Sequence, residues 1–140
     1  MIGIGCDHGG YELKLEIIKY LKKKGFSYKD FGCDGEIIDY PIVAKKVGRA
    51  VLDGTCEKGI LICGTGIGIS IAANKMKGIR CALCSDCFSA EATRLHNDSN
   101  IVALGGRVIG PELAVKIVDI FLNTSFSGEE RHVRRISLIE

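Results

Sequence analysis

The segment that most restricts the fold of this chain is residues 60–76, where an apolar run ends abruptly in a glycine-rich loop. Residues 60–63 are Ile-Leu-Ile-Cys, residues 64–68 contain three alternating glycines, and helix-compatible residues follow up to Met76. An apolar run bounded by glycines in this way predicts a buried strand, a tight loop and the start of a helix. A strand that leads directly into a helix is a building unit of α/β folds.

The same loop is predicted to bind an anion. Its glycines let the backbone approach a ligand closely, and the first N–H groups of a helix lack partners within the helix and lie at its positive end. Cys63 ends the strand at this point, and a nearby positive helix end favours the thiolate form of a cysteine. A thiolate beside an anion-binding loop is an arrangement suited to catalysis.

Other interpretations of this segment stay open at the level of single residues. Cysteine is among the most frequently buried residue types, so Cys63 taken alone is compatible with a structural role. A dinucleotide-binding loop requires G-x-G-x-x-G, and the third glycine is replaced by Ile69, although Asp86 lies about where a ribose-binding acid would be. A P-loop is excluded because no Gly-Lys-Ser/Thr follows.

Length and charge indicate one domain, residues 1–140, with no electrostatic preference for nucleic acid or membranes. A chain of this length buries roughly 68 to 70% of its unfolded surface, enough for one core without disulfides. The net charge is +2, and no apolar run approaches the ~18 residues of a membrane span. Because the first residues form a strand-like pattern instead of a secretory signal, we expect a cytoplasmic protein.

The seven cysteines are expected to be reduced thiols, since their number is odd and no secretory signal precedes them. Cys81, Cys84 and Cys87 form C-x-x-C-x-x-C, which matches part of an iron–sulfur ligand pattern. However, residues 79–84 are predicted to form a strand, in which positions three apart point to opposite faces of the sheet. A fourth cysteine followed by proline is also missing, so no metal site is predicted.

Five apolar segments alternate with amphipathic ones along the chain. Strands are expected at residues 2–6, 26–31, 60–63, 79–84 and 101–104, with helices between and after them, the fourth helix being capped by Ser85 and closed by residues 96–98. Strands that alternate with helices require a parallel sheet covered on both faces. We therefore predict a three-layer α/β/α Rossmann-like domain with a five-stranded parallel sheet, followed by a basic helix at about residues 129–140.

In such a sheet ligands bind at the carboxyl ends of the strands, and polar candidates gather there. Asp7 and His8 follow the first strand, Cys63 ends the third, and Asp86 and Arg107 follow the fourth and fifth. Asp7 and His8 alone are equally compatible with helix capping. Because Cys63 is predicted at the same edge of the sheet, we favour a role for Asp7 and His8 in a ligand-binding site.

The basic C-terminal segment contains a pair of arginines at helical spacing. Arg131 and Arg135 are four residues apart, so two guanidinium groups on one helical face could bind a single phosphate. A solvated helix face is the commoner role of such a segment. The pair nevertheless favours a phosphorylated small molecule as ligand.

Five short motifs, in this order, resemble the ribose-5-phosphate isomerase B family and together span nearly the whole chain. They are Gly5–Gly10, Asp39–Pro41, Cys63–Ser70 with Ala72–Lys75, Arg94–Asp98 and Gly106–Arg107. The wider family includes galactose-6-phosphate isomerase subunits and enzymes active on allose 6-phosphate. One branch has serine in place of the cysteine and takes its base from a glutamate in the loop. With Cys63 and the uncharged Ile69, this chain resembles the cysteine branch.

The resemblance implies that ribose 5-phosphate and ribulose 5-phosphate are interconverted through a cis-enediolate, without a metal or organic cofactor. Cys63 would move a proton between C2 and C1, Thr65 would orient a hydroxyl, and His96 would open the furanose ring. The charge that develops on oxygen would be held by backbone amides in the loop, those of Gly64, Gly66, Ile67, Gly68, Ile69 and Ser70.

The remaining residues carried by the resemblance would bind the substrate. Those expected at sugar hydroxyls are Asp7, Tyr40 and Asn97, and those expected at the phosphate are His8, Arg107, Arg131 and Arg135.

The helix that leads to His96 poses a geometric problem. It starts near Asp86 at the carboxyl edge of the sheet and runs back about 15 Å, so His96 is expected at the opposite edge from Cys63. If His96 acts at Cys63, the simplest solution is a symmetric homodimer, or a tetramer, in which His96 and Asn97 enter the partner's pocket. The sequence does not indicate which subunit supplies each arginine.

Three alternative functions remain open from the sequence. The substrate could be a hexose 6-phosphate of the allose or galactose type, because the loops that would discriminate it from a pentose phosphate carry no recognisable pattern. A noncatalytic nucleotide-binding module would use the glycine loop and Asp86, and an iron–sulfur protein would use the three clustered cysteines.

Overall fold

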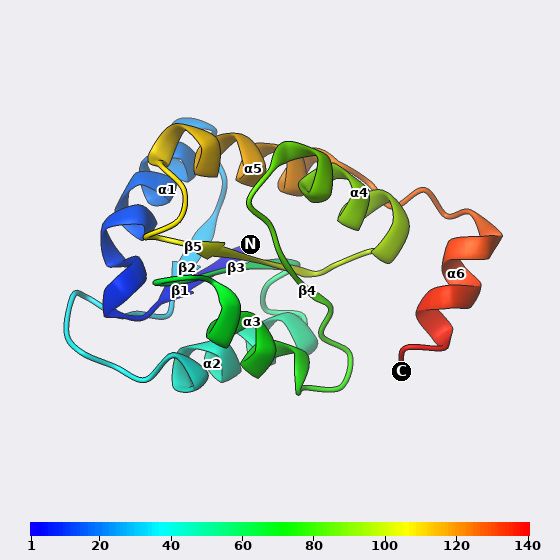
Figure 1. Cartoon of the computed structure of the whole chain (residues 1–140), viewed down its shortest axis with the longest axis horizontal. Coiled ribbons are helices and arrows are strands. Elements are labelled where there is room, and N and C mark those ends of the chain that lie inside the picture. Colours follow the sequence, from blue (N-terminus) through cyan, green and yellow to red (C-terminus); the bar gives the residue numbers. More distant parts are fainter.

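In the computed structural model, which describes residues 1–140, five strands form one sheet with helices on both faces (Figure 1). The strands are β1 (Ile2–Cys6), β2 (Tyr28–Asp30), β3 (Lys58–Cys63), β4 (Cys81–Leu83) and β5 (Ile101–Gly105). Their order across the sheet is β2-β1-β3-β5-β4, and all neighbouring pairs are parallel. The predicted fold class is confirmed.

The helices cover the sheet unequally. Helices α1 (Tyr11–Lys23), α4 (Cys87–Asn97) and α5 (Pro111–Asn123) lie on one face, and α2 (Tyr40–Leu52) and α3 (Ile67–Asn74) lie on the other (Figure 1). A short 3-10 helix, η1 (His8–Gly10), precedes α1, and α6 (Glu130–Ser137) ends the chain.

The three central strands carry the core on both of their faces. All residues of β1 and β5 are buried, and in β3 only Lys58 is partly exposed. Successive residues of β3 point to opposite sides: Ile60 and Ile62 pack under α1, α4 and α5, whereas Leu61 and Cys63 pack under α2 and α3. This burial explains why the central strands are continuous apolar runs.

The two edge strands are shorter than predicted. β2 and β4 contain three residues each, because each pairs with one neighbour only along a three-residue register. The predicted cap of α4 was also wrong by one residue: Asp86, not Ser85, accepts the Ser89 N–H at 2.7 Å. His96 and Asn97 lie within the last turn of α4, which ends at Asp98 in the left-handed conformation.

The clustered cysteines do not converge. Cys84 lies in the core beneath α1, α4 and α5, while Cys81 packs against the core on the other face of the sheet, as the strand geometry predicted. Burial raises the pKa of Cys81 to about 12 and that of Cys84 to about 11, which keeps both as neutral thiols. No three His, Cys, Asp or Glu side chains are grouped closely enough to hold a metal ion.

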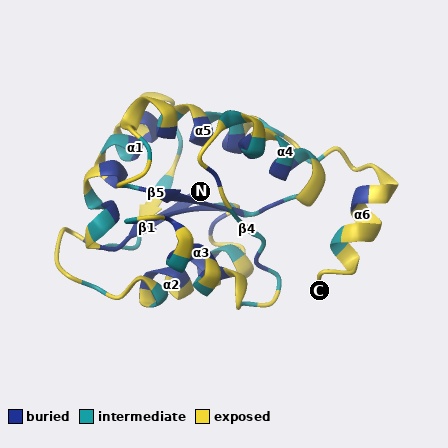
Figure 2. Cartoon of the chain, viewed as in Figure 1, coloured by how far each residue is buried: buried dark blue, intermediate teal, exposed yellow.

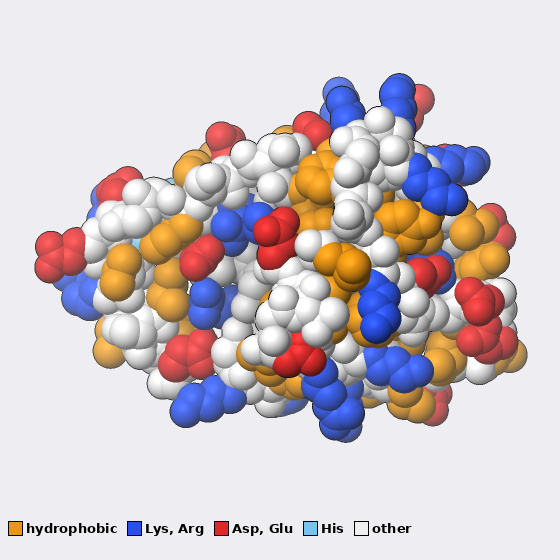
Figure 3. Space-filling model, turned by 180° about the vertical axis from the view of Figure 1, so that it is seen from behind, with side chains coloured by type: hydrophobic (Ala, Val, Ile, Leu, Met, Phe, Trp, Pro, Cys, Tyr) orange, Lys and Arg blue, Asp and Glu red, His pale blue; other side chains and the backbone are white.

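The last helix, α6, projects from the end of the molecule (Figure 1). Almost all of its residues are exposed, and His132 is its one buried residue (Figure 2). Seen from behind, the surface carries acidic and basic side chains interspersed with hydrophobic ones (Figure 3). None of the helices combines the length and apolar character needed to cross a bilayer.

Candidate active site

The loop between β3 and α3 holds a cysteine sulfur against a backbone amide. Gly66 adopts a left-handed conformation (φ 78°), and a β-carbon there would lie 2.5 Å from Cδ1 of Leu83, so only glycine fits. In this conformation the Gly66 N–H donates to Sγ of Cys63 at 3.1 Å. Cys63 is 4% exposed, at the amino-terminal end of α3. The positive helix end and the N–H donor both stabilise negative charge on this sulfur.

Four amides in the loop have no acceptor within the chain. They belong to Gly64, Thr65, Gly68 and Ile69. Free N–H groups in a loop and in the first turn of the helix that follows it are suited to binding an anion. The fully buried Ile69 side chain can contribute only through its backbone.

The other three predicted amide donors are already used inside the loop. Gly66 donates to Cys63, Ile67 donates to Oγ1 of Thr65 at 3.1 Å, and the Ser70 N–H donates to the Gly66 carbonyl. Three of the amides predicted to hold the developing charge therefore already have an acceptor within the loop. Because Thr65 accepts the Ile67 N–H, its hydroxyl hydrogen remains available to a ligand.

Glycines bring the loops that follow β1, β3 and β5 into contact. A β-carbon on Gly9 would lie 3.0 Å from the Gly64 nitrogen, and one on Gly106 would lie 2.7 Å from the Gly9 carbonyl oxygen. The Gly106 N–H donates to the Cys63 carbonyl at 2.8 Å. The carboxyl ends of three adjacent strands therefore form one continuous surface.

Asp7 and Arg107 reach this surface from either side of the cysteine loop. Asp7, 7% exposed, accepts the Gly9 N–H on Oδ1 at 2.9 Å, and its Oδ2 has no partner in the chain. The exposed His8 follows it. Arg107 donates its backbone N–H to the Gly64 carbonyl at 2.9 Å, and its Nη1 would lie 3.1 Å from a β-carbon on Gly64. The Arg107 side chain thus lies against the glycine loop.

Tyr40 closes another side of the loop. It is the first residue of α2, and a β-carbon on Gly68 would lie 2.6 Å from its Cζ and 3.0 Å from its hydroxyl oxygen. The structure therefore brings together the predicted residues Asp7, Tyr40, Arg107 and Thr65 with Cys63.

Four predicted residues are not part of this cluster. His96 and Asn97 are exposed at the end of α4, and Arg131 and Arg135 are exposed on α6. Figure 1 shows that this end of the molecule is opposite the end at which β1, β3 and β5 lead into their loops. The position of His96 agrees with the expectation from helix length.

Two residues near His96 were not predicted. The His132 ring stacks on His96, with centroids 4.6 Å apart and 20° between planes, and its Nε2 is buried without a partner. Arg80 donates to the carbonyls of Asn97 at 2.9 Å and Asp98 at 3.0 Å. No local pattern identifies such residues, because their partners are distant in sequence.

Asp86 does not have the free carboxylate that a ribose-binding acid needs. It caps α4 by accepting both the backbone N–H and the hydroxyl of Ser89, and these hydrogen bonds lower the pKa of Asp86. It also follows the edge strand β4, whereas the cysteine loop follows the central strand β3.

Comparison with known proteins agrees with this geometry. A sequence profile of the family described as Ribose/Galactose Isomerase matches residues 2–139. The chain belongs to the ribose/galactose isomerase family. It is 49% identical over 139 residues to ribose-5-phosphate isomerase B of Escherichia coli (strain K12), covering 99% of this chain and 93% of that protein.

Other relatives extend the comparison. The chain is 46% identical over 129 residues to D-erythrulose-4-phosphate isomerase of Pectobacterium atrosepticum, covering 91% of this chain and 85% of that protein. The solved structure of Clostridium thermocellum ribose-5-phosphate isomerase B has a TM-score of 0.96 at 54% identity, covering 99% of this chain and 93% of that one. The prediction that the protein is a sugar-phosphate isomerase is confirmed, and the interpretation as a noncatalytic nucleotide-binding module was wrong.

Proposed function

We propose that the protein interconverts ribose 5-phosphate and ribulose 5-phosphate, with Cys63 as the base. The observation that carries this proposal is the Cys63 thiol, whose Sγ accepts the Gly66 N–H at 3.1 Å among free loop amides. Relatives named ribose-5-phosphate isomerase B in Escherichia coli and Clostridium thermocellum support the choice of substrate.

The proposed reaction moves protons only. The Cys63 thiolate removes the proton from C2 of the open-chain aldose, the C–H electrons form the C1–C2 double bond, and negative charge develops on O1. Free loop amides donate to that oxygen in the resulting cis-enediolate. The Cys63 thiol then protonates C1 while the C2 hydroxyl proton passes to O1, giving the ketose. Since substrate and product have the same oxidation level overall, this chemistry requires no redox cofactor.

The polar residues around the loop have proposed roles in binding. The free Oδ2 of Asp7 would accept a hydrogen bond from a sugar hydroxyl, and the hydroxyl of Tyr40 would donate or accept one. Thr65 would donate its unused hydroxyl hydrogen. His8 and Arg107 would bind the phosphate, because both side chains are exposed beside the loop.

A complete site requires a second chain in this proposal. Because His96 and α6 lie at the opposite end of the sheet from Cys63, one chain cannot bring both to the same substrate. A symmetric homodimer would place His96 and Asn97, together with Arg131 and Arg135, at the partner's cysteine loop. His96 would open the furanose ring, and the arginines would bind the phosphate.

An exposed apolar surface beside the cysteine loop supports this assembly. Ile67, Leu83 and Val108 are each at least 43% exposed, and with Thr65 they line a hollow of about 220 Å³. Exposed apolar side chains gathered around a hollow are typical of protein interfaces. A second copy docked here would approach the loop that carries Cys63.

The test compares Cys63→Ala with Cys56→Ala, since both cysteines are almost fully buried but Cys56 precedes β3 and so lies at the opposite end of that strand from Cys63. Cys63→Ala should lower kcat for ribose 5-phosphate by about a thousandfold or more while still binding the sugar phosphate in calorimetry. Cys56→Ala should retain kcat. Near-normal turnover by Cys63→Ala would contradict its role as base.

The substrate is tested separately with the unmodified enzyme. Ribose 5-phosphate, allose 6-phosphate, galactose 6-phosphate and D-erythrulose 4-phosphate would be assayed side by side, and ribose 5-phosphate should have the highest kcat/KM. A higher value for another sugar phosphate would replace the substrate without removing Cys63 as the base.

A further inference from the structure

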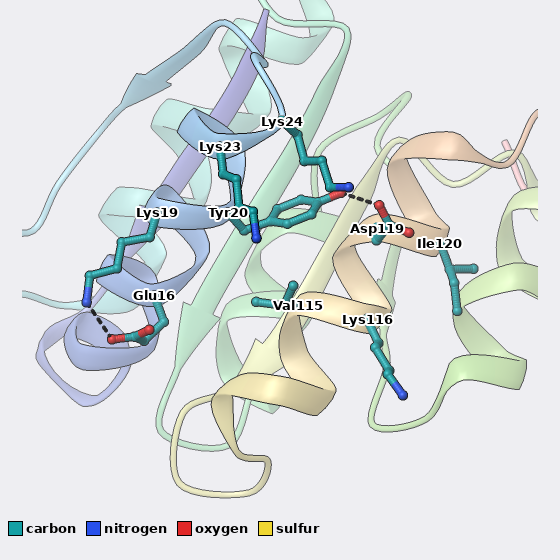
Figure 4. Close-up of a pocket in the computed structure, with 9 residues that line it drawn as sticks. All are labelled: Glu16, Lys19, Tyr20, Lys23, Lys24, Val115, Lys116, Asp119 and Ile120. Carbon is teal, nitrogen blue, oxygen red and sulfur yellow. Dashed lines mark hydrogen bonds and ion pairs between the residues drawn. The ribbon is translucent and has the colours of Figure 1, made fainter.

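A groove between α1 and α5 lies outside the candidate active site. Its volume is about 590 Å³, within the range of about 300 to 1,000 Å³ that is typical of small-molecule sites. It is lined by Glu16, Lys19, Tyr20, Lys23, Lys24, Val115, Lys116, Asp119 and Ile120 (Figure 4). None of these residues belongs to the cysteine loop or its neighbours. Since α1 starts after the carboxyl end of β1, its lysine-rich last turn lies toward the opposite edge of the sheet.

The acidic side chains of the groove are already engaged. Glu16 pairs with Lys19 at 3.0 Å. Asp119 accepts the Tyr20 hydroxyl at 2.5 Å (Figure 4). It also accepts the Asn123 side-chain amide at 3.2 Å. Burial and the Asp119 charge both raise the pKa of Tyr20, so its phenol stays protonated and remains a donor to that carboxylate.

Three lysines of the groove have no ion-pair partner: Lys23 and Lys24 at the end of α1, and Lys116 on α5. Figure 4 shows Lys23 and Lys24 beside Tyr20 and shows Lys116 on the facing helix. Basic residues in the last turn of α1 interact favourably with the helix dipole, so their presence there is explained without a ligand. The helix-dipole explanation does not apply to Lys116, which lies in the first half of α5. In Figure 4 the Lys116 side chain extends away from Lys23 and Lys24, so its ammonium group lies at the rim of the groove. Unpaired positive charge on both helices nevertheless attracts an anion to the groove.

The groove also offers apolar contacts. Val115 and Ile120 of α5 and the Tyr20 ring of α1 line it together with the aliphatic stems of the lysines. An inorganic ion would leave these surfaces uncovered, whereas an organic anion would cover them.

The surroundings of the groove favour a small ligand over a nucleic acid. The grooves that continue along α1 and α5 contain Glu12, Glu16 and Glu112, and Lys116 is the one basic residue that lines either of them. These carboxylates would repel a continuing phosphate backbone, so the positive surface is limited to the region of the three lysines.

We propose that this groove binds a small organic polyphosphate, in which Lys23, Lys24 and Lys116 bind the phosphates and the apolar lining contacts the organic part. This second site is separate from the cysteine loop and would be occupied independently of the isomerisation substrate. Adenosine 5′-diphosphate is a suitable probe because it combines two phosphates with a planar base.

The experiment is a titration of the ¹⁵N-labelled full chain with adenosine 5′-diphosphate, followed by amide chemical shifts. Saturable shifts should appear in residues 19–24 and 115–120. Lys24→Gln/Lys116→Gln should weaken this binding about tenfold or more, because two charge-assisted contacts are lost. The matched control Lys45→Gln/Lys46→Gln makes the same charge change at exposed positions of α2, on the other face of the sheet, and should leave binding unchanged. Inorganic pyrophosphate should bind about tenfold more weakly than the nucleotide.

Several results would overturn the proposal. One is the absence of saturable shifts in the groove up to about 10 mM nucleotide, and another is equal affinity in the two double variants. Shifts confined to residues 64–70 and 131–135 would place the nucleotide at the candidate active site instead. Equal affinity for pyrophosphate would show that the apolar lining makes no contribution.

Discussion

At the scale of single residues, the candidate site depends on glycines that allow other groups to approach closely. Gly68 is the clearest example, because a β-carbon there would lie 2.6 Å from Cζ of Tyr40. Tyr40 is 39% exposed, so its ring has room to move. A side chain at position 68 should therefore displace Tyr40 without unfolding the helix.

We predict that Gly68→Ala lowers kcat/KM about tenfold or more, because misplacing a substrate-binding group is costly. Its effect on stability should be small, since alanine is favoured over glycine in a helix by about 1 kcal/mol. The same substitution in a Tyr40→Ala background should cost much less, because the clash is then absent. A double-mutant cycle in kcat/KM measures this coupling, and strictly additive effects would disprove it.

His96 and Cys63 have separable tasks in the proposed mechanism. Ribose 5-phosphate closes to a furanose, whereas ribulose 5-phosphate cannot close that ring because its C5 oxygen is esterified. His96→Asn should therefore convert ribose 5-phosphate poorly but still exchange the C1 proton of ribulose 5-phosphate with deuterium, as followed by NMR. Cys63→Ala should lose both activities. If exchange in His96→Asn falls as far as turnover does, ring opening is not the separate task of His96.

At the scale of elements, α6 is attached to the domain by few contacts. His132 stacks on His96, and Glu140 pairs with Arg80 at 3.3 Å. Arg80 also holds the carbonyls at the end of α4. The same short region therefore positions both His96 and the helix that carries Arg131.

The attachment of α6 should depend on pH. The pKa of His132 is lowered below 6.5, mainly by burial and then by the charges of His96 and Arg131. The charge of Arg135 lowers this pKa further, whereas the charge of Glu129 raises it. His132 thus takes up a proton more readily when α6 is detached. The attachment should be complete above pH 6.5 and weaken as pH falls from 6.5 toward the lowered value.

Amide hydrogen exchange in residues 130–137, corrected for intrinsic rates, measures this attachment. Protection should be lower at about pH 5.5 than at about pH 7.5. His132→Phe keeps an aromatic ring against His96 and should reduce the pH dependence. Equal protection of the unmodified chain at the two pH values would contradict the prediction.

At the scale of the whole molecule, the separation of Cys63 from His96 predicts sites shared between two chains. Inactive Cys63→Ala and His96→Asn protomers, mixed in equal amounts under conditions of subunit exchange, should recover about one quarter of the unmodified activity. Half of the dimers are then mixed, and each mixed dimer regains one intact site of two.

Mixing Cys63→Ala with Thr65→Ala is the matched control. Both residues belong to one loop, so no intact site can form and activity should not recover. Failure of the first mixture to recover, despite subunit exchange measured by mass spectrometry, would place Cys63 and His96 in the same chain.

The sequence alone determined the alternation of strands and helices and therefore the parallel three-layer fold. It also determined which residues follow the strands, because strand ends are marked by local changes from apolar residues to glycine and polar residues. The position of Asp7, Cys63 and Arg107 at one edge follows from those local signals, since parallel strands end at the same edge of a sheet.

Only the tertiary structure decided which of these residues meet. The strand order makes β1, β3 and β5 neighbours and leaves Asp86 at the edge strand, and this order depends on helix packing across the sheet. The division of loop amides into free and bonded groups depends on the left-handed Gly66 and on the placement of Cys63. The stacking of His132 on His96 and the contacts of Arg80 join segments that are far apart in sequence. Local patterns carry no information about such pairs, because their contacts form only when the whole domain has packed.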